Sequence, residues 1–204
     1  MALVKYNNNS ISAVTSTGLA TGSLVPIKTL TASSSATLSF VHGTDGVVLD
    51  STYPIYKFEF INIHPANDDV HFQFQVDTGT NTSYNQTMTT TAFSAIHFED
   101  NSSATLQYST NLDQAQGTSF QILSTGMGND NDQDVCGELK IFSPSSSTFV
   151  KHFMYNGHNT EYRNASFNQF VAGYVNTTTA LTRVQFKMSS GAIASGKIKL
   201  YGIK

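Results

Sequence analysis

The sequence predicts an all-β protein built as an antiparallel, jelly-roll-like β-sandwich. Its most regular segments alternate apolar and polar residues with a period of two, as half-buried strands do. In the segment YKFEF, for example, Tyr56, Phe58 and Phe60 alternate with a lysine and a glutamate. Polar clusters separate these segments, and no long segment has apolar residues at helical spacing. Many short strands joined by polar turns, without helices, favour a two-layered β fold.

About ten segments are predicted to form strands, each short and rich in β-branched or aromatic residues. They cover residues 23–30, 36–41, 56–60, 70–76, 119–123, 137–142, 148–154, 170–176, 182–188 and 196–203. The clusters HGTDG, DTGTNTS, EDNSS, GMGNDNDQD, SPSSS and YNGHN are predicted to form the turns between them.

The chain is predicted to have one folded domain and one extended segment. Residues 1–22 are rich in Ser and Thr, include Gly18 and Gly22, and are expected to form an extended N-terminal arm. Residues 23–204 are expected to form a single β-sandwich domain, because no linker-like segment interrupts them. A fixed-period repeat and a heptad pattern are both absent, which counts against a solenoid and a coiled-coil stalk.

The composition indicates a neutral surface rich in hydroxyl and amide groups. Ser, Thr and Asn make up roughly a third of the 204 residues, while charged residues are only 12%, about half the usual share. The 14 Phe and 9 Tyr supply a core. With 11 basic residues and a net charge of −3, no nucleic-acid partner is expected. The apolar runs are too short to span a membrane, and no signal peptide is expected at the N-terminus.

The stretch INIHPANDDVHFQFQV allows two interpretations. Its two histidines, His64 and His71, bracket Asp68 and Asp69, and four such side chains are possible zinc ligands. However, Pro65 ends the preceding strand, and nothing in the spacing requires the side chains to converge. We therefore predict a plain β-hairpin, in which residues 65–69 turn the chain and Val70 begins the return strand.

A second stretch, GMGNDNDQDVCGEL, has the alternating carboxylates Asp130, Asp132 and Asp134. The helix-loop-helix calcium motif requires glycine at its sixth position and glutamate at its twelfth, where this chain has Val135 and Ile141. A looser calcium site between strands remains open. A hydrated acidic loop at the end of a sheet is the preferred interpretation, and no cofactor is expected.

The sequence does not predict an enzyme. Hydrolysis of a glycosidic bond by general acid–base catalysis needs two carboxylates on opposite sides of a cleft. The sequence does not show which glutamates, Glu59 and Glu138 among them, would face each other in this way. No G-x-S-x-G elbow and no phosphate-binding glycine loop with its lysine occurs. Cys136 has no identifiable histidine partner and cannot form an intrachain disulfide, because it is the only cysteine.

A sugar-binding site is the strongest remaining candidate. The segment MYNGHNTEYRNASFNQ looks like a loop and contains Tyr155, His158, Tyr162 and Arg163. Aromatic rings in such a loop stack on sugar rings, while neighbouring polar groups donate hydrogen bonds to the sugar hydroxyls. The competing and preferred interpretation is a long turn supported by an exposed tyrosine.

Four segments of the chain, residues 1–16, 56–85, 128–153 and 188–204, resemble small structural proteins of tailed phages. The similarity is to those of marine phages that infect cyanobacteria or related aquatic bacteria, and it extends over nearly the whole chain. The resemblance implies an all-β virion component, either a capsid decoration or a fibre-type protein. It provides no catalytic residues to carry over to this sequence.

This resemblance sets the expected partners and location. A homo-oligomer, expected to be a trimer, would cover the free edges of the sheets, and other virion proteins of the capsid or tail would bind it. The N-terminal arm is expected to add to a neighbouring molecule or to the particle surface. Assembly would take place in the host cytoplasm, a reducing compartment in which a single cysteine stays reduced. The alternative function is recognition of a host-surface glycan by a tail fibre.

Overall fold

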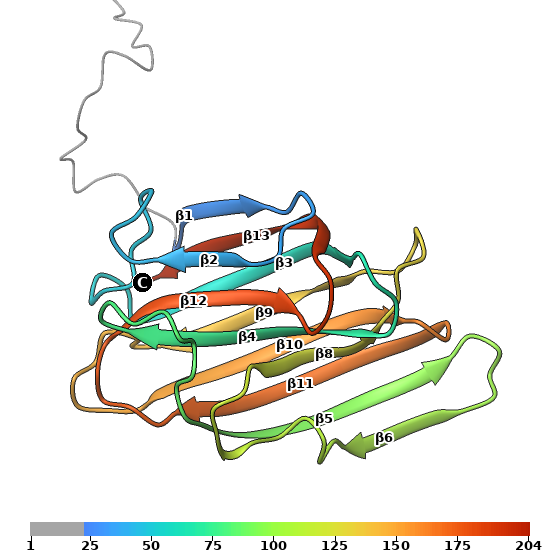
Figure 1. Ribbon diagram of the computed structural model, residues 1–204. Helices are drawn as coiled ribbons and strands as arrows, with labels where there is room; N and C mark the ends of the chain where they lie inside the picture. The colour runs from blue at the N-terminus through green and yellow to red at the C-terminus, as the bar shows by residue number, and fades with distance from the viewer. Residues whose placement is uncertain (1–22) are drawn as a thin grey trace, which may run out of the picture.

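The computed structural model describes residues 23–204, so the predicted N-terminal arm lies outside the described residues. This part of the chain is all-β and contains no helix, and therefore no helix able to cross a membrane. Figure 1 shows its strands stacked in two layers. The strands are β1 (Leu24–Thr31), β2 (Leu38–Val41), β3 (Ile55–Pro65), β4 (Val70–Thr78), β5 (Met88–Phe98), β6 (Ala104–Tyr108), β7 (Ala115–Gly117), β8 (Gln121–Met127), β9 (Val135–Phe142), β10 (Lys151–Glu161), β11 (Ala165–Val175), β12 (Leu181–Met188) and β13 (Ile193–Ile203).

The pairing of these strands is that of a jelly roll. One layer begins with the order β1-β13-β3-β9, and the other has the order β2-β12-β4-β8, with all pairs antiparallel. The chain alternates between the layers in its first four strands and pairs early strands with late ones, as a rolled-up hairpin does. Among the described strands, the ladders of the two layers are joined by one residue pair, Glu161 with Met127. The predicted fold class is therefore confirmed.

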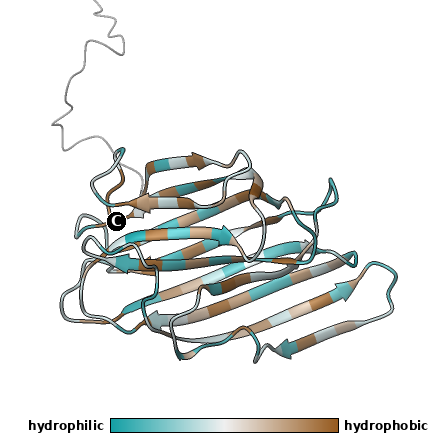
Figure 2. Ribbon diagram, in the orientation of Figure 1, coloured by the Kyte–Doolittle hydropathy of each residue, from teal (hydrophilic) through white to brown (hydrophobic). Residues whose placement is uncertain are grey.

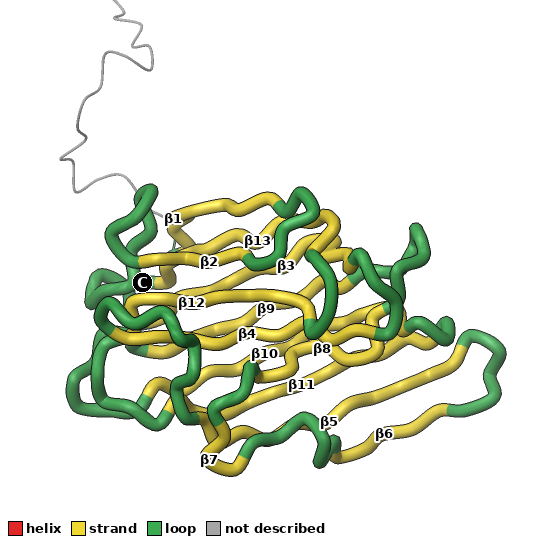
Figure 3. Tube along the Cα trace, viewed as in Figure 1, coloured by secondary structure: helices red, strands yellow, loops and turns green. Residues whose placement is uncertain are grey.

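Two insertions widen one layer beyond the jelly roll. The hairpin β10–β11 pairs with β9, and β5 then pairs with β11, giving the order β9-β10-β11-β5. The short strands β6 and β7 both pair with the far side of β5 (Figure 3). We call this layer the wide sheet and its solvent-facing surface the outer face.

The core lies between the two layers and is dominated by phenylalanine. Apolar and polar residues alternate along many of the strands in Figure 2. Phe60 of β3 meets Phe72 of β4 with their ring centroids 5.1 Å apart, and both side chains are buried. Phe186 of β12 packs against both rings. Edge-to-face and offset ring pairs of this kind add to the stability that burial of apolar area provides.

The predicted hairpin at residues 65–69 is wrong in its pairing. Both strands and the turn occur where the sequence places them, but β3 pairs with β13 and β9, while β4 pairs with β8 and β12. The turn therefore carries the chain from one layer to the other. Alternation predicts which residues of a strand face inward, but two strands that pair and two strands that face each other across a core have the same alternation.

The predicted turn YNGHN is also wrong, because all five residues lie inside β10. Its glycine, Gly157, is needed for packing and not for a turn. A Cβ atom at this position would lie 1.9 Å from the hydroxyl oxygen of Tyr155. Glycine within a strand often marks such a close approach. The predicted strand at 148–154 begins later than expected, because residues 148–150 belong to the preceding loop, and it extends further, to Glu161.

Lys151, the first residue of β10, gives the protein a pH-dependent stability. Its side chain is fully buried, and its Nζ donates hydrogen bonds to the carbonyl oxygens of Phe149 and Thr177. Burial lowers the pKa of Lys151. As pH rises through this lowered pKa, the native state releases a proton that the unfolded chain keeps up to its ordinary pKa of about 10.4. The free energy of unfolding therefore gains a contribution that increases with pH in this window.

We expect Lys151→Met to remove this contribution. Denaturant unfolding of the wild type and the variant at several pH values between 8 and 10.5 checks it. The wild type should gain stability relative to the variant as pH rises, whatever the offset between them at pH 7. Two profiles that stay parallel would contradict the prediction.

Candidate interaction surface

The outer face of the wide sheet carries an apolar band over its inserted strands. Four of the large apolar side chains that are exposed in residues 23–204 lie there, with exposed fractions of 46–75%. The register places Phe170 opposite Phe93, and Phe93 opposite Tyr108, so these three rings form a row across β11, β5 and β6. The rings of Phe93 and Phe170 stack with centroids 4.8 Å apart. We define the outer band as Phe93, Leu106, Tyr108, Met154 and Phe170.

Strand β5 produces this band by inverting the usual alternation. Phe93 points to solvent and is 46% exposed, whereas Ala92 and Ser94 on either side point inward and are fully buried. The hydroxyl of Ser94 bonds to that of Ser109 at 3.0 Å, which satisfies it in the interior. A strand that buries serine and exposes phenylalanine forgoes the usual stability gain from apolar burial. Exposed contiguous apolar surface of this kind marks an interaction site.

A shallow groove continues the outer band toward β9. It has a volume of about 550 Å³ and is lined mainly by apolar atoms. Met154 of β10 and Ala172 of β11 form its centre, and the rings of His152 and Tyr174, 6.1 Å apart, lie at one side. Because opposite residues of an antiparallel pair share one face, all four side chains belong to the outer face.

The other half of the outer face has charged side chains that form ion pairs with one another. Lys57 lies between Glu59 and Glu138, and Glu138 also contacts Lys140. The hydrogen bond that Lys57 donates to Glu138 raises the pKa of Lys57. Burial opposes ionisation of Glu138, but bonds from both lysines keep its pKa below the ordinary value. This network pairs its charges with one another, whereas the outer band leaves large apolar side chains exposed to solvent.

The four residues of the candidate sugar site do not share one loop, because Tyr155 and His158 lie within β10 and Tyr162 and Arg163 lie in the turn that follows it. They lie on the β10–β11 hairpin, whose turn is short. Tyr155 points into the core and is buried, and its hydroxyl bonds to Ser124 Oγ at 2.7 Å. His158 lies on the outer face and bonds to Ser166. Because Tyr155 is buried and His158 lies on the opposite side of the strand, these two side chains cannot bind one sugar together.

The other two residues lie at the tip of the hairpin. Arg163 forms an ion pair with the buried Glu161 at 2.7 Å, and its guanidinium lies 5.1 Å from the ring of Tyr162 and 5.3 Å from that of Phe98. These contacts fix the turn after β10. The structure therefore gives Arg163 a structural partner that the sequence did not reveal.

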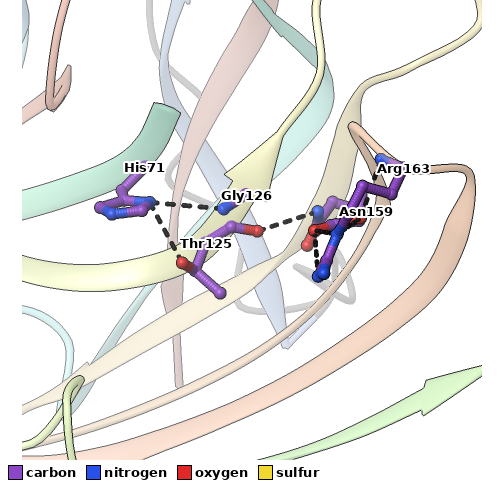
Figure 4. Close-up of polar contacts among 6 residues, drawn as sticks. His71, Thr125, Gly126, Asn159 and Arg163 are labelled. Atoms are coloured by element: carbon purple, nitrogen blue, oxygen red, sulfur yellow. Dashed lines mark hydrogen bonds and ion pairs between the residues drawn. The ribbon is translucent and has the colours of Figure 1, made fainter. Parts of the chain in front are cut away.

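Figure 4 shows how this hairpin is tied to the neighbouring layer. His71 Nδ1 accepts a hydrogen bond from the backbone N–H of Gly126 at 3.3 Å, so it is unprotonated and also accepts from the hydroxyl of Thr125. The side chain of Asn159 donates to the carbonyl oxygen of Thr125 at 3.3 Å. The contacts link β4, β8 and β10, which places His71 in a structural network.

The candidate metal ligands do not converge either. Within residues 23–204, no group of three or more His, Cys, Asp or Glu side chains is arranged to hold a metal ion. Asp130 and Asp132 are exposed in the loop before β9. Asp134 lies near His64 and His158, and burial raises its pKa while both imidazoles oppose that rise. His64 Nδ1 donates to the carbonyl oxygen of Gln133 at 2.6 Å, so its ring is held by the backbone.

We expect Tyr155→Phe to lower the free energy of unfolding by about 1–2 kcal/mol, because the buried hydroxyl of Ser124 loses its partner. Burial also raises the pKa of Tyr155 well above its ordinary range, which agrees with a hydroxyl that stays protonated and bonded. Thermal or denaturant unfolding measures the loss. The double variant that also carries Ser124→Ala should recover part of it. A variant as stable as the wild type would contradict the assigned contact.

Comparison with known proteins adds nothing to this geometry: no family model, curated protein or solved structure matches the chain.

Proposed function

We propose that the protein is a self-associating structural component on the exterior of a tailed phage particle, either a capsid decoration protein or a short appendage. The resemblance of the sequence to small phage structural proteins supports the proposed location on the phage particle. The observation that carries self-association is the inverted alternation of β5, which exposes Phe93 and buries Ser94.

The inversion supports an interface because it lies on an inserted strand, where the sheet extends beyond the jelly roll. In β3 and β4 the phenylalanines Phe58, Phe60, Phe72 and Phe74 all point into the core. Aromatic residues and methionine are enriched at the centres of protein interfaces, and charged residues are depleted there. The outer band has this composition, since it consists of three aromatic residues, a leucine and a methionine.

The proposed partners are further copies of this chain together with capsid or tail proteins of the particle. Assembly would take place in the host cytoplasm, where the exposed thiol of Cys136 stays reduced. Catalysis, nucleic-acid binding and membrane binding form no part of the proposal. The glycan-recognition alternative loses support, because Tyr155 is buried in the core.

Antibody-gold labelling of purified particles tests the proposed place. We expect label on the intact particle, either spread over the capsid or confined to the tail, and the protein's peptides in the particle by mass spectrometry. Particles without label and without these peptides would overturn the proposal.

A matched pair of variants tests the surface. Phe93→Thr removes the exposed ring from the outer band and should be lost from particles. Phe149→Thr removes a side chain that is 70% exposed in the loop before β10, away from the outer band, and should be retained. Equal incorporation of the two variants would show that the outer band is not the contact surface.

A further inference from the structure

Strand β6 is a free sheet edge that lacks the usual protection against pairing. Its five residues, ATLQY, are all exposed, and within residues 23–204 it pairs only with β5. Edges are normally blunted by charged residues, proline, bulges or very short strands. Strand β1 at the opposite edge has Pro26, Lys28 and an irregular register between them, and the edge strands β2 and β7 have four and three residues. Strand β6 contains no charged residue, proline or glycine.

The backbone of β6 is oriented to pair on its free side. Two bonds flank the strand: Phe98 N–H donates to Ser103, and Ser109 N–H donates to Ala92. Because hydrogen-bonded positions alternate along an antiparallel ladder, residues 103, 105, 107 and 109 direct their backbone groups to β5. The backbone groups of Ala104, Leu106 and Tyr108 then point to the free side.

We infer that two copies of the chain pair through β6, antiparallel and about a two-fold axis at Leu106. In this register Leu106 lies opposite Leu106 of the second copy, and Ala104 lies opposite Tyr108. All three positions are those whose backbone groups face the free side. The pairing therefore makes about six backbone hydrogen bonds, two for each of three residue pairs. An identical, self-complementary surface on both molecules is what a two-fold contact requires.

The side chains of β6 suit this arrangement. Leu106 and Tyr108 belong to the outer face, because they lie opposite Ala95 and Phe93. Pairing brings the outer bands of the two copies side by side into one continuous surface. No charge in β6 opposes the contact. This inference rests on the proposed self-association and names β6 as the contact and a second copy of the chain as the partner. The contact has two-fold symmetry, whereas the resemblance to phage proteins implies a trimer.

Leu106→Pro and Leu106→Thr separate backbone pairing from a side-chain contact. The N–H that proline removes points away from β5, so Leu106→Pro leaves the β5–β6 bonds intact while blocking the free side. Threonine keeps that N–H and suits a strand. By sedimentation of the full chain at micromolar concentration, the wild type and Leu106→Thr should have twice the 22.1 kDa mass of one chain. Leu106→Pro should be a monomer with an unchanged circular dichroism spectrum. A monomeric wild type, or a Leu106→Pro variant that associates like the wild type, would overturn the inference.

A disulfide tests the register of the proposed β6–β6 pairing in a chain whose β6 backbone is unchanged. In a Cys136→Ser background, Leu106→Cys places two thiols across the proposed axis, at a Cα separation of about 5.5 Å that a disulfide spans. Mild oxidation should give a covalent dimer linked at residue 106. Thr91→Cys, on the outer face of β5 but away from the axis, should give none. Loss of association in Leu106→Pro without cross-linking of Leu106→Cys would show that the two-fold pairing is wrong. Another segment, such as residues 1–22 of a neighbour, would then pair with the edge.

These outcomes are distinct from those of the particle experiment. Labelled particles together with a monomeric protein would remove the β6 contact and leave the place on the virion. A cross-linked dimer that is absent from particles would confirm the contact and remove the virion role.

Discussion

Replacing Phe186 by alanine is expected to lower the free energy of unfolding by about 3–5 kcal/mol, as other large-to-small changes in a well-packed core do. The ring of Phe186 on β12 is fully buried between the two layers. It lies 5.3 Å from the ring of Phe58 and 5.2 Å from that of Phe60 on the wide sheet. It also stacks on Phe72 of its own layer at 5.8 Å. Since one ring joins both layers, its loss leaves a cavity that neighbouring side chains cannot fill without moving a sheet.

Denaturant unfolding of wild type and variant measures this effect. The matched control is Phe149→Ala, because Phe149 is 70% exposed and its removal should change stability by less than about 0.5 kcal/mol. A loss of less than about 1 kcal/mol for Phe186→Ala would mean that the layers do not pack through this ring.

Asp77→Ala is expected to have the second-largest effect, a loss of about 3 kcal/mol, because hydrogen bonds to a buried charge are stronger than neutral ones. The carboxylate of Asp77 is fully buried near the end of β4. It accepts bonds from the backbone N–H of Tyr84 at 2.8 Å and from the side-chain amides of Asn81 and Gln86 at 2.9 and 3.0 Å. It thereby organises the connection from β4 to β5, on which the outer band depends.

The substitution leaves these donors without their acceptor, so both stability and the order of residues 79–87 should fall. Chemical denaturation measures the loss of stability, and faster proteolytic cleavage within residues 79–87 shows the loss of order. Asp100→Ala is the control, because that carboxylate lies in an exposed turn and accepts a bond from Ser102. Equal losses for the two variants would show that Asp77 contributes no more than a surface turn residue.

The sequence was sufficient for the fold class and for the strands with strong alternation. Strands β3 and β4 begin and end close to where alternation and Pro65 place them. Their partners could not be predicted, because pairing depends on contacts between residues that are far apart in the chain. In β10, Gly157 resembled a turn residue, although the ring of Tyr155 requires its lack of a side chain.

The interaction surface was the least predictable feature. Strand β5, MTTTAFSAIHF, lacks a regular alternation of apolar and polar residues and is not among the strands predicted from the sequence. Even with the strand known, the usual rule would place Phe93 inside and Ser94 outside. The inversion lies on a strand inserted beyond the jelly roll, where the inward-facing hydroxyl of Ser94 bonds to that of Ser109. A phenylalanine set among threonine, alanine and serine was the available signal.

The position of β13 has a consequence for synthesis of the chain on the ribosome. Of the strands in residues 23–204 this one is made last, yet it lies between β1 and β3 and pairs with both. Until residues 193–203 leave the exit tunnel, β1 has no partner within the described chain and one edge of β3 stays open. The jelly roll therefore closes only after β13 has left the tunnel. Folding that must wait for contacts this distant in sequence is slow, and until then the nascent polypeptide has open strand edges for a chaperone to shield.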